Sequence, residues 1–352
     1  MTRMLCLVLI VTASGCAETS DRLHDASRSA GSSPPQATTR RFVDVTWDTV
    51  WMHGGNAGDT TLLIPFAISA AGGRVHVGDR AEQRVVALDA ATGAVEWLSG
   101  RQGAGPGEFR RMDAIAATAD GGVLVADGGN GRIAVVDAGG RTRDYLRPDG
   151  IPIYLSLCPL ADGAVAVGTG GPGHPVVLVD RRGAVVGRPE LPWPDLNGMY
   201  PAAPRQGLFA AEPGGAGCLY ALALGRGFTR LADGRFEAAH DYVEWFDVPE
   251  SILTPSIPGQ PPNERLKGGW APAASGATVD GDEVTVAFWG RTKDRGRLLD
   301  VYSRSDGRYL RTVRAPVAMD RMAYADGTWF FLHTRDGYPA VLAARPRHSH
   351  RP

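Results

Sequence analysis

Two carboxylate–guanidinium pairs recur in the sequence at the same spacing. Asp79 precedes Arg84 and Asp127 precedes Arg132, each pair beside a short apolar run. Such a pair could serve as a catalytic dyad, but an active site needs it once and this chain repeats it. An Asp that accepts hydrogen bonds from turn N–H groups and pairs with an Arg stabilises a turn. We therefore interpret both pairs as structural.

A glycine-rich loop, GAGPGEF at residues 103–109, could in principle hold a phosphate. A phosphate loop needs a helix N-terminus after the glycines and usually a Lys, and the sequence has neither here. Glycine permits bends with positive φ, and proline fixes φ. The loop is therefore predicted to carry the chain from the outer strand of one sheet to the inner strand of the next, with Phe109 filling apolar space.

A repeat explains both features. Residues 73–90 (GRVHVGDRAEQRVVALDA) align without a gap to residues 121–138 (GGVLVADGGNGRIAVVDA). A period of about 40–50 residues with short alternating strands indicates propeller blades, whereas helical repeats would show a 3.6-residue period. The same strand rhythm continues to the end of the chain. We predict an all-β, six-bladed β-propeller, with the fourth blade the least regular.

The last predicted blade lacks a fourth strand, and residues 42–52 (FVDVTWDTVWM) form an alternating strand without a repeat of their own. We expect this N-terminal strand to complete the outer edge of blade six, because closure removes an exposed sheet edge. The propeller is predicted to span residues 42–346.

The second repeat resembles NHL-type repeats and the bacterial six-bladed β-propeller lipoproteins related to them. The resemblance covers roughly residues 62–147 and thins beyond. The matching residues of the second unit are Asp127, Asn130, Arg132, Ile133 and Asp137, and those of the first are Asp79, Arg84, Val85 and Asp89. Enzymes of this architecture place carboxylates, Asn or His around a divalent cation in the channel, so the resemblance makes a metal-dependent hydrolase or lyase the alternative function.

Blade connectivity predicts that the crossovers and the turns between second and third strands share one face. Two long insertions, residues 192–206 and 248–270, should lie there too, and long loops on a rigid scaffold often bind ligands. These loops could instead only cover the channel, with their tryptophans as packing. The candidate binding residues are Arg101, Glu108, Arg111, Trp193, Tyr200, Arg205, Arg265, Trp270, Arg291 and Lys293.

The channel candidates are Asp113, Asp320 and Arg321, which begin inner strands. A catalytic metal needs about three converging protein ligands. The inner strands are otherwise apolar, and no histidine falls clearly on one. We therefore assign no metal ligand or cofactor, with a divalent cation as the alternative.

The chain has 352 residues and a formal net charge of −1, which argues against nucleic-acid binding. Cys158 and Cys218 could form one disulfide in an oxidising compartment or remain buried thiols. A core of this size needs no covalent link, so thiols are the favoured expectation.

The N-terminus predicts export. Residues 4–11 are apolar but too short to span a bilayer, and Ala13-Ser14-Gly15-Cys16 resembles a lipobox, although Leu is usual where Ala13 stands. An ordinary secretory signal is the alternative. Residues 1–16 are thus a predicted signal with lipidated Cys16, residues 17–41 a disordered tether, and residues 347–352 a frayed tail.

Together these features predict a membrane-anchored, periplasmic or cell-surface binding module without catalytic activity. We expect a monomer that binds a protein, peptide or glycan through its loop-rich face.

Overall fold

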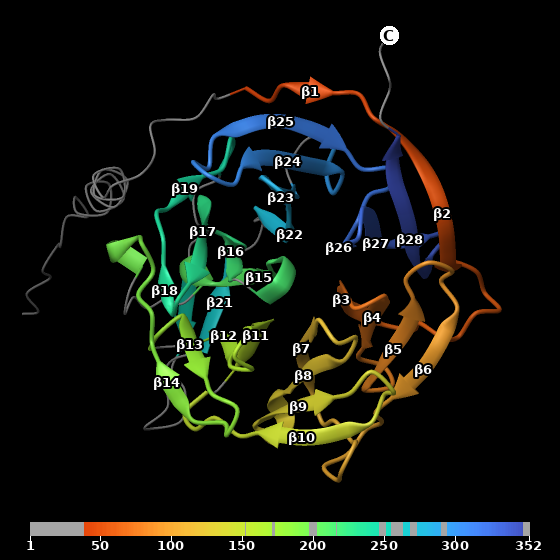
Figure 1. The fold of residues 1–352 in the computed structure, drawn as a ribbon, viewed down its shortest axis with the longest axis vertical. Helices are drawn as coiled ribbons and strands as arrows, with labels where there is room; N and C mark the ends of the chain where they lie inside the picture. Colours follow the sequence, from red (N-terminus) through yellow and green to blue (C-terminus); the bar gives the residue numbers. More distant parts are fainter. Residues whose placement is uncertain are drawn as a thin grey trace, which may run out of the picture.

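Six sheets surround a common axis in the computed structural model (Figure 1). The structure describes residues 39–151, 153–170, 173–196, 203–215, 217–245, 251–254, 263–267, 273–289 and 294–347. Each sheet has its first strand at the axis and its last at the rim, so the six-bladed propeller predicted from the repeat is confirmed.

Blades one to three each contain four antiparallel strands in sequence order. Blade one comprises β3 (Pro65–Ala71), β4 (Arg74–Asp79), β5 (Arg84–Asp89) and β6 (Val95–Ser99). Blade two comprises β7 (Met112–Ala117), β8 (Val123–Asp127), β9 (Arg132–Val136) and β10 (Thr142–Leu146). Blade three comprises β11 (Tyr154–Pro159), β12 (Val165–Thr169), β13 (Val176–Val179) and β14 (Val185–Gly187).

Blade four has an interrupted outer edge. It comprises β15 (Gly207–Ala211), β16 (Cys218–Leu222) and β17 (Gly227–Ala232), and both β18 (Arg235–Phe236) and β19 (His240–Asp241) pair with β17. Blade five comprises β22 (Ala274–Asp280), β23 (Glu283–Phe288), β24 (Leu298–Ser303) and β25 (Tyr309–Arg314). Blade six comprises β26 (Arg321–Ala325), β27 (Thr328–Arg335), β28 (Tyr338–Arg347) and β2 (Thr46–Gly54).

The alternation within each strand produces the core, because successive side chains face opposite neighbouring blades. In β4, Val75 and Val77 are fully buried in the cluster shared with blade six. The ring of His76, between them, is tilted against the ring of Trp97, with 5.4 Å between the two ring centroids. Both faces of an inner blade strand are therefore covered, as a closed ring requires.

The N-terminal strand closes the ring, as predicted. β2 pairs antiparallel with β28, from Thr46 opposite Arg347 to Gly54 opposite Ala340. The predicted single strand at residues 42–52 is in fact divided, since β1 (Phe42–Val43) pairs in parallel with β25 of blade five. The N-terminal segment thus runs along the outside of blades five and six (Figure 1).

Two tryptophans show that β2 fills the place of an ordinary outer strand. Trp97 of blade one donates from Nε1 to Ala138 O at 2.9 Å and packs on Gly140 of blade two. Trp51 of β2 donates to Ala90 O at 3.0 Å and packs on the next blade in the same way. The N-terminal strand therefore reproduces between blades six and one the contact that joins blades one and two.

Two features differ from the sequence-based boundaries. Arg41, assigned to the tether, donates to Leu310 O of blade five, and Arg347, assigned to the tail, ends β28.

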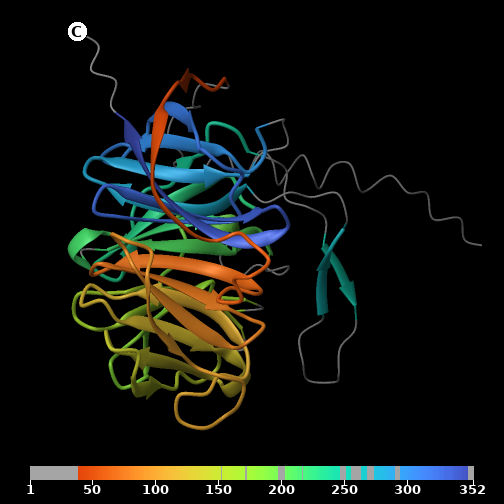
Figure 2. The same ribbon diagram turned by 90° about the vertical axis from the view of Figure 1, so that its right-hand side faces the viewer.

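A short hairpin of β20 (Ser251–Thr254) and β21 (Asn263–Leu266) stands apart from the six sheets (Figure 2). No helix within the described ranges is long and apolar enough to span a membrane.

Cys158 and Cys218 form a disulfide, so the expectation of two buried thiols is wrong. The bond joins β11 of blade three to β16 of blade four, and both residues are fully buried. Apolar burial alone does not exclude a bond when neighbouring blades bring two sulfurs together.

Candidate functional site

The loops of the propeller end on two faces. The crossover face carries the segments that lead from an outer strand to the next inner strand, such as residues 100–111, together with the turns between second and third strands. The turn face carries the turns between first and second strands, such as residues 118–122. Of the predicted binding residues, Arg101, Glu108 and Arg111 lie on the crossover face, in the segment that joins blades one and two.

Asp127 fixes one crossover to its blade. Its carboxylate accepts from the backbone N–H of Arg110 at 2.9 Å and from Arg132 Nε at 3.0 Å. Arg132 also donates from Nη2 to Glu108 O at 2.6 Å. Both side chains are almost completely buried. The pair therefore holds the glycine-rich loop in place and is not available to a substrate.

The equivalent residues of blade one, Asp79 and Arg84, also bind backbone groups of the segment that enters their blade. Asp79 accepts from the backbone N–H of Leu63 at 2.5 Å and of Ala81 at 2.9 Å. Arg84 donates instead to Thr61 O at 3.0 Å. Both residues stabilise the segment that enters β3, although their side chains turn to different backbone groups.

The glycine-rich loop is the predicted crossover between blades one and two. Phe109 is fully buried, and its ring lies where a Cβ on Gly100 would be, at φ +104°. Glu108 accepts from Gly105 N at 2.9 Å and pairs with Arg101 at 2.7 Å. These contacts, the Gly105 N–H first, lower the pKa of Glu108. The glycines of this loop therefore allow the Phe109 ring and the Glu108 carboxylate to pack closely against the backbone.

Exposed arginines gather on the crossover face over blades six, one and two. The exposed set is Arg80, Arg101, Arg110, Arg111 and Arg321. Arg80 lies 4.3 Å over the ring of Phe66, at the start of β3. These residues belong to three neighbouring blades, and Arg80 lies close enough to Arg321 to contribute to its lowered pKa.

The channel candidates lie at this opening. Asp113 pairs with Arg111 through two contacts, of 2.9 and 3.1 Å, and Arg321 donates to Asp320 O at 2.8 Å. The pKa of Arg321 is lowered, mainly because the surrounding protein displaces water from its guanidinium. Asp320 opposes this shift and the nearby Arg80 adds to it.

Tyr154, the first residue of β11, is a polar group at this end of the channel that was not predicted from the sequence, because the strand is otherwise apolar. Its side chain is 1% exposed, and its hydroxyl has no hydrogen-bond partner among the described residues. Burial, with Asp113 and Asp127 nearby, raises the pKa of Tyr154 to about 12. The hydroxyl therefore stays protonated beneath the arginines.

Several predicted binding residues do not reach the surface. Trp193 and Arg205 are both 1% exposed. Trp193 belongs to the apolar cluster beside blade four, and Arg205 donates to Gly173 O. These two side chains therefore pack in the interior, which was the alternative to a binding role for the long loops. Arg265 is exposed on β21. Tyr200, Trp270, Arg291, Lys293 and Cys16 lie outside the described residues.

Within the described ranges, no three His, Cys, Asp or Glu side chains come close enough to hold a metal ion. Asp113 and Asp320 do not join a third such group there. Among the described residues, the channel opening thus carries arginine side chains beside the carboxylates of Asp113 and Asp320, with no converging set of metal ligands.

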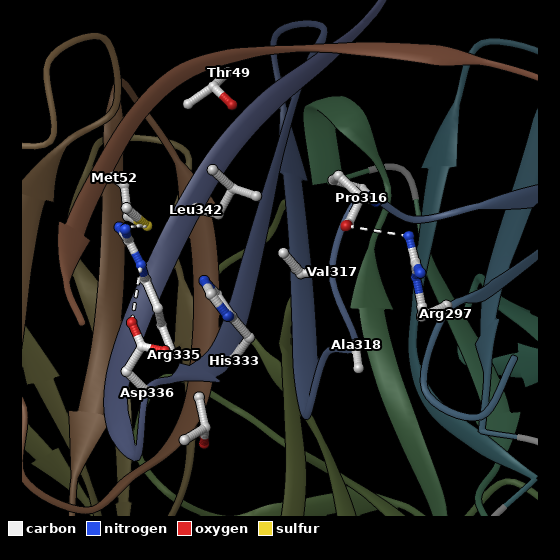
Figure 3. Close-up of a pocket in the computed structure, with 11 residues that line it drawn as sticks. Thr49, Met52, Arg297, Pro316, Val317, Ala318, His333, Arg335, Asp336 and Leu342 are labelled. Atoms are coloured by element: carbon white, nitrogen blue, oxygen red, sulfur yellow. Dashed lines mark hydrogen bonds and ion pairs between the residues drawn. The ribbon is translucent and has the colours of Figure 1, made fainter. Parts of the chain in front are cut away.

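A groove between blades five and six was not anticipated from the sequence. It encloses about 600 Å³ between the crossover at Pro316–Ala318 and strands β27 and β28 (Figure 3). His333 lies in it between Val317 and Arg335, and burial lowers its pKa. Arg335 contacts Met52 Sδ at 3.5 Å.

No protein-family model and no curated protein matches the sequence. Solved structures match the fold. A protein of Bacteroides fragilis named as exported has a TM-score of 0.55 at 10% identity, covering 90% of this chain and 99% of that one. Hydrazine synthase of Kuenenia stuttgartiensis has a TM-score of 0.51 at 13% identity, covering 84% and 98%.

A third structure, catalytically inactive virginiamycin B lyase of Staphylococcus aureus with quinupristin, has a TM-score of 0.50 at 10% identity and covers 79% of this chain and 80% of that one. Identities this low establish a common architecture and no common activity. The chain is thus a six-bladed β-propeller similar in fold to exported and enzymatic propellers.

Proposed function

We propose that this chain is an exported, membrane-anchored binding module without catalytic activity, and that its crossover face binds an acidic peptide or a carboxylate-bearing glycan. The disulfide between Cys158 and Cys218 fits an oxidising compartment outside the cytoplasm. The fold likeness to an exported propeller agrees with this location.

The exposed arginines are the observation that carries the ligand assignment. Arg80 and Arg321 approach the channel opening from blades one and six, whereas Arg111 of blade two is paired with Asp113. Arg guanidinium groups bind carboxylates through paired hydrogen bonds. A carboxylate between Arg80 and Arg321 would relieve the repulsion that contributes to the lowered pKa of Arg321. Tyr154 lies buried near Asp113 beneath this rim.

The metal-dependent hydrolase or lyase lacks a comparable observation, since the described residues contain no converging ligand set. The likeness to virginiamycin B lyase concerns the fold. The binding function therefore has the stronger support.

A defined peptide tests the proposal. The full-length chain with Cys16→Ser should bind a fluorescein-labelled ten-residue poly-glutamate, and added salt should weaken that binding. Arg80→Gln with Arg321→Gln should reduce the affinity at least about tenfold. Arg143→Gln is the matched control, because Arg143 is 60% exposed on the rim of blade two, away from the opening.

Equal binding by the double variant and the control would contradict a crossover-face site. Failure of poly-glutamate to bind, together with binding of poly-lysine, would contradict the ligand class. Circular dichroism on each variant verifies that the propeller is intact.

A further inference from the structure

The half of the channel nearest the turn face contains a cavity of about 880 Å³, a volume within the range of small-molecule pockets. All six inner strands line it, through residues such as Ile68, Ala116, Phe209 and Ala277. Every residue of β3 is partly exposed, although β3 is an innermost strand. This exposure shows that side chains do not fill the axis.

The cavity also extends outward between blades two and three. Leu124 and Leu146 of blade two face Leu157 and Val165 of blade three along this extension. Each of these four side chains is at most 4% exposed. The apolar part of a bound molecule would therefore be enclosed by packed aliphatic side chains, which is the main source of affinity in such pockets.

The polar groups at the opening favour a positive charge. Asp120 and Asp326 are exposed on the first turns of blades two and six and line the cavity. Hydrogen bonds from Thr118 and Gly122 lower the pKa of Asp120, so this carboxylate is ionised at neutral pH. Phe209 and Tyr324 add aromatic faces, which attract cations.

Three further charged residues line the cavity, and one of them, Asp144, is exposed on β10 at the rim of blade two. Glu212 is 3% exposed and binds Arg230 at 2.7 Å and Arg304 at 3.0 Å. Arg181, at the outer end of the extension, donates to Asp162 O. Among the described lining residues, Arg181 is thus the cationic one, and it lies after β13 at the outer end of the extension, away from the axis, where an anionic ligand would need a cation.

We propose that this cavity binds a small molecule with an apolar chain or ring system and a positively charged amino group. The apolar part lies in the channel and between blades two and three, and the ammonium group lies at the opening beside Asp120 and Asp326. The site is separate from the arginine-lined crossover face, so it stands or fails independently of the proposed function.

Decylamine is the probe, with decanol and decanoate as analogues of the same chain length. Isothermal titration calorimetry on the full-length chain with Cys16→Ser should show one decylamine per chain. Decylamine should bind at least about tenfold more tightly than decanoate, with decanol between them.

Two pairs of variants locate the site. Ala211 is exposed and lines the cavity, whereas Ala91 is exposed on blade one and does not. Ala211→Trp should reduce decylamine affinity at least about tenfold by filling the opening, and Ala91→Trp should not. Asp326 and Asp233 are both exposed at φ 49°, a conformation that Asn tolerates.

Asp326→Asn should weaken decylamine binding several-fold and leave decanol unchanged, and Asp233→Asn, outside the cavity, should change neither. Absence of decylamine binding, or binding that Ala211→Trp does not reduce, would overturn the site. Equal affinities for the three probes would overturn the cationic ligand class. Poly-glutamate binding should survive Ala211→Trp, which separates this site from the crossover face.

Discussion

Arg40 and Asp300 lie 260 residues apart in the chain and form an ion pair against blade five, with Arg40 Nη2 2.9 Å from Asp300 Oδ2. Asp300 is fully buried, and its other partner is the Thr312 hydroxyl at 2.6 Å. Arg40 also pairs with Glu244 and lies 4.6 Å over the ring of Phe288. The segment before β1 is therefore anchored by a buried charge.

Arg40→Met should lower the free energy of unfolding by about 3 kcal/mol, because removing one partner leaves the Asp300 carboxylate buried without a cation. Urea denaturation followed by tryptophan fluorescence measures the change. Arg143→Met, which breaks an exposed pair with Asp137, should leave the midpoint almost unchanged. Equal midpoints for the two variants would show that the Arg40 contact does not stabilise the propeller.

Reduction of the disulfide should destabilise the protein. The bond closes a loop between residues separated by 60 positions, which corresponds to about 4 kcal/mol in the chain-entropy model. Cys158→Ala with Cys218→Ala should unfold at a lower urea concentration than the oxidised protein, and dithiothreitol should no longer shift its midpoint. A midpoint that dithiothreitol does not change in the unmodified protein would contradict the bond.

Buried His76 should make stability depend on pH. Burial, aided by Arg74, lowers the pKa of His76 to about 4, whereas an unfolded chain titrates near about 6.5. The folded state then stays neutral while the unfolded state takes up a proton. His76 therefore costs no stability above pH 6.5, and its contribution falls by about 3 kcal/mol as the pH drops to about 4.

His76→Gln should flatten the decline of unfolding free energy between about pH 6.5 and 4, measured by urea titration at each pH. His240 and His333, whose pKa values burial also lowers, should leave part of the slope. His174→Gln is the matched control, because His174 is exposed, and this variant should leave the slope unchanged. An unchanged slope in His76→Gln would mean that solvent reaches the imidazole.

Membrane attachment remains a prediction of the sequence, because Cys16 lies outside the described residues. Cys16→Ser should move the protein from the membrane fraction to the soluble fraction of the envelope after cell fractionation. Metabolic labelling with a fatty-acid analogue should mark the unmodified chain and not the variant. Membrane retention of the variant would refute acylation at this residue.

Local pattern was sufficient to predict the architecture. The aligned repeats at residues 73–90 and 121–138 become β4–β5 and β8–β9, because alternating apolar residues and turn signals act within each blade. Ring closure was predictable because the last blade lacked one strand. The division of residues 42–52 between two blades was not, since it depends on where blade five presents Asp300 and Leu310.

The candidate site was less accessible to sequence reasoning. Trp193 and Arg205 occur in a long loop, and their burial depends on packing against blade four, which no local pattern reports. The disulfide depends on the distance between blades three and four. The channel cavity arises because six strands with many small residues meet at the axis and leave it unfilled. The sequence of any one strand therefore does not predict the cavity.

The pairing of β2 with β28 joins the strand before blade one to the last strand of the described chain. The strand that completes the ring is synthesised near the start of the chain, and its partner at residues 338–347 comes almost at the end. The ring therefore closes only after residues 338–347 have been synthesised. A truncated copy that lacks β28 would leave the main-chain groups of β2 without partners, and an unpaired segment of this kind is open to proteolysis.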